Sequence, residues 1–161
     1  MVIKNELLLP NDTNTLNNLV GGQLMYWMDI AGGICAHRHA QANIVTASVD
    51  NISFKQPISL GSIVTLKAQV TRAFQTSIEV YIEVWAEHIT RELHYQSNTA
   101  FFTFVALDDQ GRPVPVPELI PETDRERELY AGALRRRQLR LILAGRMKPD
   151  EAGELKSIFN L

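Results

Sequence analysis

The sequence lacks the features that mark several large protein classes. Its 161 residues hold a single cysteine, Cys35, so no disulfide can form within the chain, which is typical of proteins from a reducing compartment. No uninterrupted apolar run approaches the roughly 20 residues that a helix needs to span a bilayer. The opening residues, MVIKNELLLP, lack the apolar core of a secretory signal peptide. We therefore expect a cytoplasmic protein with no membrane association.

An excess of charge of one sign is also lacking. Lysines and arginines number 16 against 18 acidic residues, so nothing draws the whole chain toward nucleic acid or anionic lipid. With 45% hydrophobic and 21% charged residues, the composition is that of one globular domain with a tail. No phosphate-binding or dinucleotide-binding glycine motif and no Ser/His/Asp set is visible. His37 and His39 lie two apart and do not share a helix face, so we expect no metal site.

The most informative stretch runs from Asn11 to Gly33. A polar loop rich in asparagine leads into Gly21-Gly22, and a strongly apolar segment follows. Its apolar residues recur at helical spacing, which predicts a helix over residues 20–39. Because this helix is apolar nearly all round, we expect neighbouring elements to enclose it on most sides.

Two further signals refine this helix. Asn17 or Asn18 is expected to be its N-cap, because asparagine side chains accept hydrogen bonds from the first helical amides. Gly32 and Gly33 cost roughly 1 kcal/mol each relative to alanine inside a helix. We interpret the pair as a place where another backbone approaches closely, as it would beneath a sheet.

The middle of the chain alternates between apolar and polar residues, which is typical of strands with one buried face. Strands are expected at residues 2–9 (a short edge strand), 44–51, 63–70, 77–86 and 92–106. Short connections between the long strands favour an antiparallel meander. The simplest packing is an α+β fold in which a curved antiparallel sheet wraps the long central helix.

The composition changes after residue 107. Four of the seven prolines fall between residues 113 and 121, which predicts an extended arm leaving the sheet. Residues 122–146 look helical, with acidic residues first and arginines last, an order that complements the helix dipole. We therefore divide the chain into a domain at 1–107 and a proline-rich arm with a C-terminal helical tail at 108–161.

Asp29 and Asn14 are the strongest candidates for chemistry. A carboxylate within an apolar helix is costly to bury. Asp29 is therefore either solvated on an exposed strip, paired with a base such as Arg38, or a general base or nucleophile. Asn14 is either a turn former or an amide that orients water or holds a carbonyl oxygen. The residues alone leave these alternatives open.

Other candidates are weaker. Gly21 and Gly22 offer unshielded amides to an oxyanion at the helix start, although a glycine pair also suits a flexible loop. The arginines at 135–137 either line a solvated face or bind an anionic group such as a nucleotide phosphate. His88 and His94 are expected to pair across a hairpin, and Cys35 is expected in the core.

Four short motifs, taken with their spacings, resemble the hotdog-fold acyl-CoA thioesterases of the YciA and brain acyl-CoA hydrolase type: Asp12-Thr13-Asn14, Gly21-Gly22, Met28-Asp29 and Gly32-Gly33. Further matches are Val45-Thr46, Val49-Asp50, Phe54, Pro57-Ile58-Ser59, Gly61 and Glu83-Val84-Trp85. The resemblance covers about residues 8–107. It implies the hotdog fold and hydrolysis of acyl-CoA to a free carboxylic acid and CoA, with CoA as part of the substrate and no separate cofactor.

The resemblance also implies roles for individual residues. Asp29 matches the catalytic carboxylate, and Asn14 matches a catalytic asparagine that is contributed across a dimer interface. Gly21 and Gly22 match the backbone that polarises the thioester carbonyl. The family forms homodimers that often assemble into hexamers, as trimers of dimers, and the expected context is fatty acid metabolism.

The CoA contacts differ from the family pattern. In the family, CoA lies in a groove between subunits, along the strand that begins near Thr76-Ser77. Many relatives carry Gly-Arg directly before that pair, whereas this chain has Phe74-Gln75. Arg72 or the arginines of the tail are the expected replacements for the phosphate contact. Relatives also often carry glycine at the position of Asn17, and asparagine tolerates a positive φ better than most residues.

Three other functions fit the sequence less well. A non-catalytic acyl-CoA binding or sensor module on the same fold would not need both Asn14 and Asp29. A dehydratase of this fold would use a histidine, and none lies near the helix start. A purely structural domain would not explain the density of motifs.

Overall fold

The computed structural model describes residues 1–50, 52 and 54–159, which divide into two compact units, Met1–Glu118 and Leu119–Leu161. The elements of the first unit are β1 (Val2–Leu7), η1 (Pro10–Asp12), α1 (Gly21–Ala40), β2 (Asn43–Asp50), β3 (Ile63–Ala73), β4 (Ser77–His88), η2 (Ile89–Arg91) and β5 (Leu93–Leu107). The elements of the second unit are α2 (Asp124–Leu143), η3 (Pro149–Glu151) and α3 (Gly153–Phe159).

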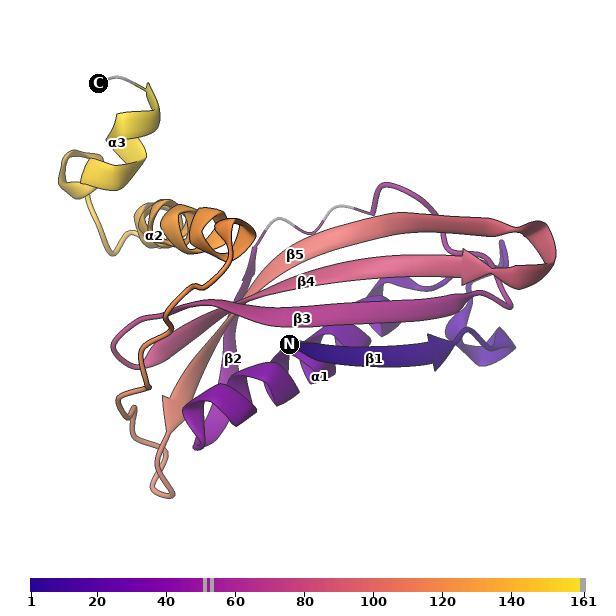
Figure 1. Ribbon diagram of the computed structural model, residues 1–161, viewed down its shortest axis with the longest axis horizontal. Coiled ribbons are helices and arrows are strands. Elements are labelled where there is room, and N and C mark those ends of the chain that lie inside the picture. The colour runs from indigo at the N-terminus through magenta and orange to yellow at the C-terminus, as the bar shows by residue number, and fades with distance from the viewer. Residues whose placement is uncertain (51, 53, 160–161) are drawn as a thin grey trace. The chain divides into compact units, whose positions relative to one another are not determined.

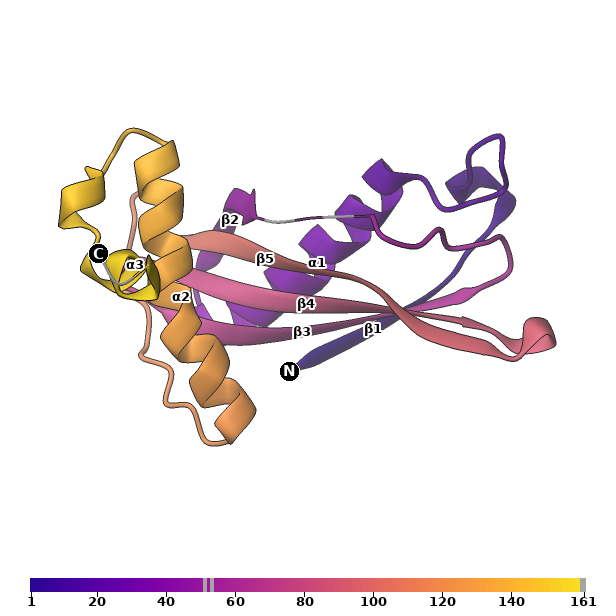
Figure 2. The same cartoon turned by 90° about the horizontal axis from the view of Figure 1, so that it is seen from above.

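The first unit is a five-stranded sheet with α1 lying along one face (Figures 1 and 2). The strand order is β1-β3-β4-β5-β2, and every neighbouring pair is antiparallel. The predicted α+β arrangement of a long helix against a curved antiparallel sheet is therefore confirmed. The predicted meander holds only for β3-β4-β5. β2 pairs with β5 instead of β3, and residues 58–60 of the connection between β2 and β3 bond to residues 17–19, before the start of α1.

The core lies between α1 and the sheet. Inward-facing side chains of β4 and β5 and the facing side of α1 are almost completely buried: Ile78, Val80, Ile82, Val84, Ala86, Phe102, Phe104, Met28 and Ala31. Each large aliphatic or aromatic side chain in this set contributes roughly 1.5–3 kcal/mol through burial. This burial is why the apolar helix is stable only beneath the sheet.

The two interior glycines of α1 differ in their surroundings. A Cβ atom at Gly32 would lie 3.0 Å from both Ile82 Cδ1 and Phe104 Cζ, so the sheet does approach closely there. A Cβ atom at Gly33 would meet its nearest neighbour, Ile44 Cδ1, at an ordinary 3.5 Å. The nearest atoms at both positions belong to side chains, so the expected close approach of another backbone is not found, and the tight contact with side chains of the sheet is limited to Gly32.

The strands begin and end near their predicted positions. β3 and β4 are longer than expected, and the strand expected over 44–51 includes Asn51, which lies outside the described residues. The expected pairing of His88 with His94 is wrong. In the register of β4 and β5, His88 faces Leu93, and the His94 ring stacks on Trp85 with ring centroids 5.3 Å apart.

The proline-rich arm does not leave the sheet directly. After a turn at Asp108, the amide of Val114 donates to Ala106 O at 3.0 Å, and that of Val116 donates to Gln75 O at 3.1 Å. The intervening Pro115 has no amide hydrogen, so only the valines can extend the hydrogen bonding of the sheet edge. Their side chains also pack on the core. The compact unit thus extends to Glu118, while the boundary at 107 stays a prediction about where the shared domain ends.

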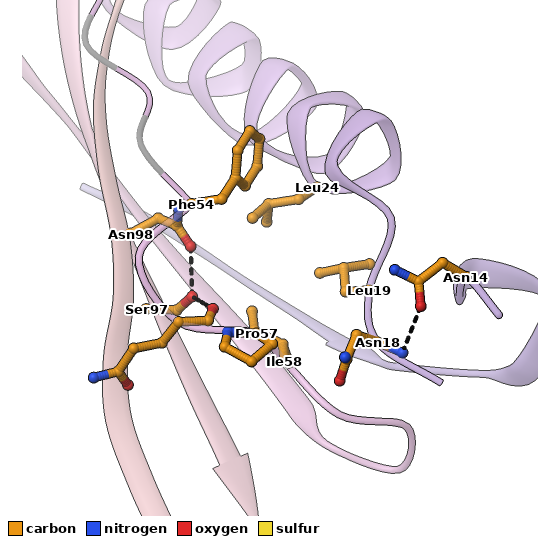
Figure 3. A pocket seen from close by; sticks show the side chains of 10 residues that line it. Asn14, Asn18, Leu19, Leu24, Phe54, Pro57, Ile58, Ser97 and Asn98 are labelled. Carbon is orange, nitrogen blue, oxygen red and sulfur yellow. Dashed lines mark hydrogen bonds between the residues drawn. The ribbon is translucent and has the colours of Figure 1, made fainter. Parts of the chain in front are cut away.

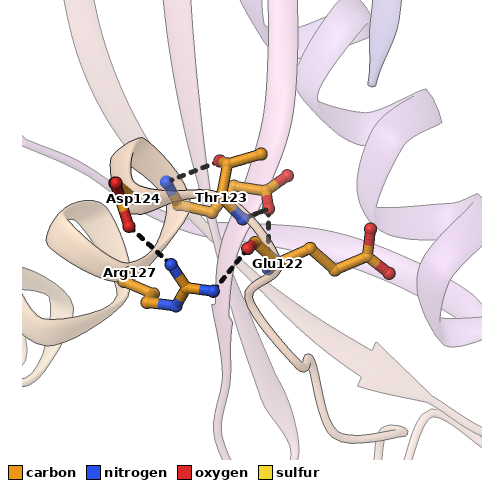
Figure 4. A network of polar contacts seen from close by, with 5 residues as sticks. Glu122, Thr123, Asp124 and Arg127 are labelled. Atoms are coloured by element: carbon orange, nitrogen blue, oxygen red, sulfur yellow. Dashed lines mark hydrogen bonds and ion pairs between the residues drawn. The ribbon is translucent and has the colours of Figure 1, made fainter.

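In the second unit, a capping box closes the N-terminus of α2 (Figure 4). The Thr123 hydroxyl accepts from the Glu126 amide, and the Glu126 carboxylate accepts from the amides of Glu122 and Thr123. These backbone donors hold the pKa of Glu126 below its usual value. Arg127 adds an ion pair to Asp124 at 2.6 Å and a hydrogen bond to Glu122 O. The helix therefore begins at residue 124, two residues after the predicted start.

The remainder of this unit is short. Gln138 of α2 accepts a hydrogen bond from the Leu155 amide of α3 at 2.9 Å, which joins the two helices. Residues 160 and 161 of the predicted tail lie outside the described residues. Among the described helices of the chain, none combines the length and apolar character that a membrane span requires.

Candidate active site

The start of α1 has no side-chain cap. The N-cap residue is Val20, whose side chain cannot accept a hydrogen bond, so the expected cap at Asn17 or Asn18 is wrong. The first amides that bond back to Val20 O are those of Gln23 and Leu24, both at 3.1 Å. The amides of Gly21 and Gly22 therefore remain available at the positive end of the helix dipole, as the glycine pair suggested.

The loop before α1 is shaped by its asparagines. Asn14 Oδ1 accepts hydrogen bonds from the amides of Leu16 at 2.9 Å and Asn18 at 3.2 Å. Asn17 adopts a φ of 57°, in the left-handed region, which fits the expectation for a position where relatives carry glycine. Since both partners of Asn14 are backbone donors, the side-chain atom facing them must be the oxygen. The Asn14 Nδ2 group makes no hydrogen bond within the described part of the chain and can donate to a ligand.

A cavity of about 230 Å³ opens beside this loop (Figure 3). Its wall combines apolar side chains with amides and a hydroxyl: Asn14, Asn18, Leu19, Leu24, Phe54, Gln56, Pro57, Ile58, Ser97 and Asn98. The Phe54 ring is close to the helix start, since a Cβ atom at Gly21 would lie 3.1 Å from Phe54 Cζ. The cavity therefore lies next to the uncapped amides and to Asn14.

Asp29 lies farther along α1 and is half-buried. Its Oδ1 atom accepts a hydrogen bond of 2.6 Å from the hydroxyl of Thr46 on the edge strand β2. The ion pairs of the described residues do not include Asp29, so the alternative in which it pairs with a base such as Arg38 is not found. Sequence reasoning missed Thr46 as a partner. In the sequence, Thr46 was marked only as part of Val45-Thr46, one of the matches to the thioesterase family.

One subunit does not bring Asp29 and Asn14 together. Eight residues separate Gly21 from Asp29, which corresponds to about 12 Å along a helix axis. Asn14 lies before the helix start, and Asp29 does not line the cavity to which Asn14 contributes. A single carbonyl group cannot contact both the helix start and Asp29 at hydrogen-bonding distance.

The three residues expected to contact CoA gather at the β3–β4 hairpin. The Arg72 guanidinium lies 5.6 Å from the Phe74 ring centroid, and the Phe74 amide donates to Ser77 O at 2.8 Å. The backbone carbonyl of Thr76 accepts from the Ala106 amide at 2.9 Å.

This hairpin and the cavity occupy different positions along the sheet. Ser77 pairs with Val105 near the end where α1 finishes, whereas the cavity residue Asn98 pairs with Val84 farther along β4. The structure therefore brings Arg72, Thr76 and Ser77 together with one another but not with Asn14.

The remaining reactive side chains have structural surroundings. Burial raises the pKa of the Cys35 thiol, which lies in the core as expected and is a poor nucleophile. His37 Nδ1 and His39 Nε2 each lie 2.8 Å from a backbone carbonyl, of Ala42 and Pro117 respectively. A carbonyl only accepts, so each of these ring nitrogens carries a hydrogen and donates.

Comparison with known proteins gives a consistent result. The thioesterase superfamily profile matches residues 16–93. The chain is 42% identical over 135 residues to an uncharacterized acyl-CoA thioester hydrolase, YkhA, of Bacillus subtilis, a match that covers 84% of this chain and 78% of that protein. It also superimposes on a hexameric acyl-CoA thioesterase with a TM-score of 0.85 and 35% identity, covering 88% of this chain and 91% of that one.

A third similar protein is the acyl-CoA hydrolase of Staphylococcus aureus, solved with butyryl-CoA, CoA and CoA disulfide. The TM-score is 0.81 and the identity 37%, over 89% of this chain and 90% of that one. The same enzyme was also solved as three variants, in which an asparagine, an aspartate and a threonine are each replaced by alanine.

Proposed function

This chain belongs to the acyl-CoA thioester hydrolases of the thioesterase superfamily, and we propose that it hydrolyses its substrates at a site shared between two subunits. The protein is a hotdog-fold enzyme that converts acyl-CoA to a free carboxylic acid and CoA. The finer assignment, to particular residues and to a two-subunit site, rests on the geometry around α1 and on the spacing of three side chains.

The assignment of catalytic residues rests on the spacing of an asparagine, an aspartate and a threonine along the chain. The asparagine, aspartate and threonine replaced in the Staphylococcus aureus variants are separated by 15 and 17 residues along that chain. Asn14, Asp29 and Thr46 are separated by the same 15 and 17 residues here. Because the Thr46 hydroxyl binds the Asp29 carboxylate, the threonine fits the role of a positioning residue.

The distance along α1 supports a site built by two subunits. Asp29 lies too far from the helix start to act on a carbonyl held by the amides of Gly21 and Gly22 in the same chain. A two-fold axis beside α1 and β2 would bring Asp29 of one subunit to the helix start and Asn14 of the other.

The surface around Asp29 suits such an interface. β2 is an edge strand, and edge strands are normally covered or paired. Large apolar side chains on α1 and β2 remain exposed in the single chain: Met25, Tyr26, Ile34 and Val45. We therefore infer a homodimer along this edge that assembles further into a hexamer as a trimer of dimers.

In this site, water attacks the thioester carbonyl carbon while Asp29 accepts a proton from the water. The oxyanion accepts hydrogen bonds from Asn14 Nδ2 and from the amides of Gly21 and Gly22 of the partner subunit. Such donors act where charge develops, and the loss of one typically costs about 10²–10³ in rate. Collapse of the intermediate breaks the C–S bond, and the CoA thiolate leaves with the proton from Asp29.

The CoA portion is assigned to the β3–β4 hairpin. Arg72 would supply a cation to a phosphate, and Thr76 and Ser77 would supply hydroxyl donors at the same edge. We infer a cytoplasmic enzyme of fatty acid metabolism. This context agrees with the single buried thiol of Cys35.

A thiol-release assay tests the function directly. Purified protein is incubated with acyl-CoA substrates from acetyl to palmitoyl, and free CoA is measured. We expect turnover with at least one substrate and its loss in Asp29→Asn, with the oligomer unchanged by size-exclusion chromatography. Tight acyl-CoA binding without thiol release would instead identify a sensor module.

A further inference from the structure

A shallow groove lies between the C-terminal half of α1 and the first residues of β2. It is largely open in the single chain, and six residues line it: Gly33, Ile34, His37, Arg38, Asn43 and Ile44. Ile34 and Ile44 give the groove an apolar surface, and His37 and Arg38 add basic groups toward the end of α1. Because Ile34 also belongs to the edge assigned to the dimer, a second subunit would cover a ligand held in this groove.

Packing within the chain does not explain the glycine in this groove. A Cβ atom at Gly33 would make only ordinary contacts, at 3.5 Å to Ile44 Cδ1 and 3.9 Å to Phe104 Cε1. Glycine inside a helix is nevertheless less favourable than alanine. One reason to keep glycine at such a position is the close approach of a ligand to the backbone. Because Gly33 lines the groove, its missing side chain indicates a ligand that lies against α1.

Arg38 supplies a cation to the same groove. Its side chain is exposed, and it takes part in no ion pair or hydrogen bond among the described residues. The neighbouring His37 donates through Nδ1 to Ala42 O at 2.8 Å, which joins the end of α1 to the residues before β2. A guanidinium group binds phosphate oxygens with strong, charge-assisted hydrogen bonds. The basic end of the groove is therefore suited to a phosphate.

The distance from Asp29 to Arg38 matches the pantetheine arm of an acyl-CoA substrate. The two residues are nine positions apart, which corresponds to about 14 Å along the helix axis. About 13 bonds join the thioester sulfur to the first phosphorus of CoA, and an extended chain of that length spans roughly 15 Å. Gly33 lies one turn beyond Asp29 on the same helix face, so the arm would pass it. A thioester at Asp29 thus brings the diphosphate of CoA to Arg38.

The groove opens at the end of the sheet that carries the β3–β4 hairpin. Val45, the residue after Ile44, pairs with Val105, and Val105 pairs with Ser77 of the hairpin. The adenosine end of CoA would continue beyond the groove toward this end of the sheet. The 3′-phosphate can then reach the hairpin, where a phosphate contact is assigned to Arg72.

We propose that this groove binds the pantetheine arm of the substrate and that Arg38 binds its diphosphate, in the subunit that supplies Asp29. The inference rests on the proposed function, because it places the reacting thioester at Asp29. It adds Gly33 and Arg38 as binding residues and leaves the 3′-phosphate to Arg72. The enzyme should therefore prefer thioesters that carry the diphosphate over those that lack it.

The test compares three thioesters of the acyl group that the enzyme hydrolyses fastest. The thiols are CoA, dephospho-CoA, which lacks only the 3′-phosphate, and pantetheine, which lacks all phosphates. The kcat/KM for the CoA ester is divided by that for the pantetheine ester, so that any loss of folded enzyme cancels. We expect Arg38→Gln to lower this ratio about tenfold, because a charge-assisted hydrogen bond is lost. The ratio of the dephospho-CoA ester to the pantetheine ester should fall equally.

The matched control is Arg91→Gln. Arg91 is also exposed, but it lines a different pocket, beside the loop that precedes α1. The wild-type ratio should be retained in this variant. An unchanged ratio in Arg38→Gln would overturn the proposal. A fall in Arg91→Gln alone would also overturn it, because the arm would then leave Asp29 in the opposite direction.

Gly33→Ala tests the path of the arm independently of charge. The variant should melt no lower than the wild type, because the methyl group makes only ordinary contacts. The KM should rise several-fold for the CoA and the pantetheine esters alike, because the methyl group narrows the groove. An unchanged KM for both esters would overturn the placement of the arm while leaving the hydrolase intact. Absence of thiol release from every ester by the wild type would overturn the proposed function as well.

Discussion

The hydroxyl of Thr46 donates a 2.6 Å hydrogen bond to Oδ1 of Asp29, linking the edge strand β2 to the middle of α1. One carboxylate oxygen is thereby occupied, and the carboxylate has a defined orientation. The second oxygen is the one that can accept a proton from water. This contact gives the strand edge a role in the chemistry as well as in assembly.

Replacing Thr46 should weaken catalysis without weakening the fold. Thr46 is exposed, so Thr46→Ala is expected to leave the melting temperature within a few degrees of the wild type. We expect kcat to fall about tenfold with little change in KM, because the carboxylate loses its orientation. Thr46→Ser keeps the hydroxyl and should restore most of the rate. Equal losses in the alanine and serine variants would refute a positioning role.

Asn14 has two functions that different substitutions separate. Its Oδ1 atom supports the loop by accepting from Leu16 and Asn18, while Nδ2 is the group available to substrate. Asn14→Asp keeps an acceptor and removes the donor, so kcat/KM should fall about 100-fold or more at an unchanged melting temperature. Asn14→Ala should lose similar activity and also stability. Activity in Asn14→Asp close to the wild type would mean that the side chain only shapes the loop.

A substitution at Gly22 tests where the thioester carbonyl binds. A Cβ atom at Gly22 meets nothing within 4 Å, so Gly22→Ala should fold as stably as the wild type. If a carbonyl lies on the neighbouring amides, the added methyl group will obstruct it, and KM should rise several-fold. Steady-state kinetics measure KM, and thermal melting of the same preparation measures stability. Unchanged kinetics would place the carbonyl elsewhere.

The two interior glycines of α1 should respond oppositely to alanine. At Gly32 the new methyl group would press on Ile82 and Phe104, and overpacking of this kind costs about 1–3 kcal/mol of unfolding free energy. At Gly33 the contact is ordinary, and the gain in helix propensity should stabilise the protein by up to about 1 kcal/mol. Urea titrations of both variants measure the difference. Equal destabilisation would show that the helix has less room beneath the sheet than these distances indicate.

The helix and the strands could be read from the sequence because their signals are local. The apolar residues of α1 repeat at helical spacing, and β3, β4 and β5 alternate. The strand order could not be read in this way. Whether β2 pairs with β3 or with β5 depends on contacts between segments far apart in the sequence, such as residues 58–60 with residues 17–19, and no local pattern specifies such contacts.

The candidate site was predicted only in part. Asp29 stands out because it interrupts an apolar helix, and the glycines mark the helix start. Thr46 does not stand out in its local sequence, because its partner, Asp29, lies on another element, 17 residues earlier in the chain. Ser97 lines the cavity at a β-bulge, where Val84 pairs with Asn98 and Trp85 with Gln96, and an alternating pattern does not reveal a bulge. The uncapped helix start was also missed, because nearby asparagines are good caps and were expected to serve as such.

We propose that each active site takes Asn14 from one subunit and Asp29 from the other. Mixing Asn14→Ala with Asp29→Asn tests it most directly. In a mixed dimer, a shared site would carry either both substitutions or neither. Random mixing should therefore restore about a quarter of wild-type activity from two inactive parents.

The two variants are co-expressed with different affinity tags, and native mass spectrometry confirms that subunits mix before thiol release from acyl-CoA is measured. Recovery of about a quarter of wild-type activity is the predicted result. If mixed oligomers form but remain as inactive as either parent, both residues act within one subunit and the account is contradicted.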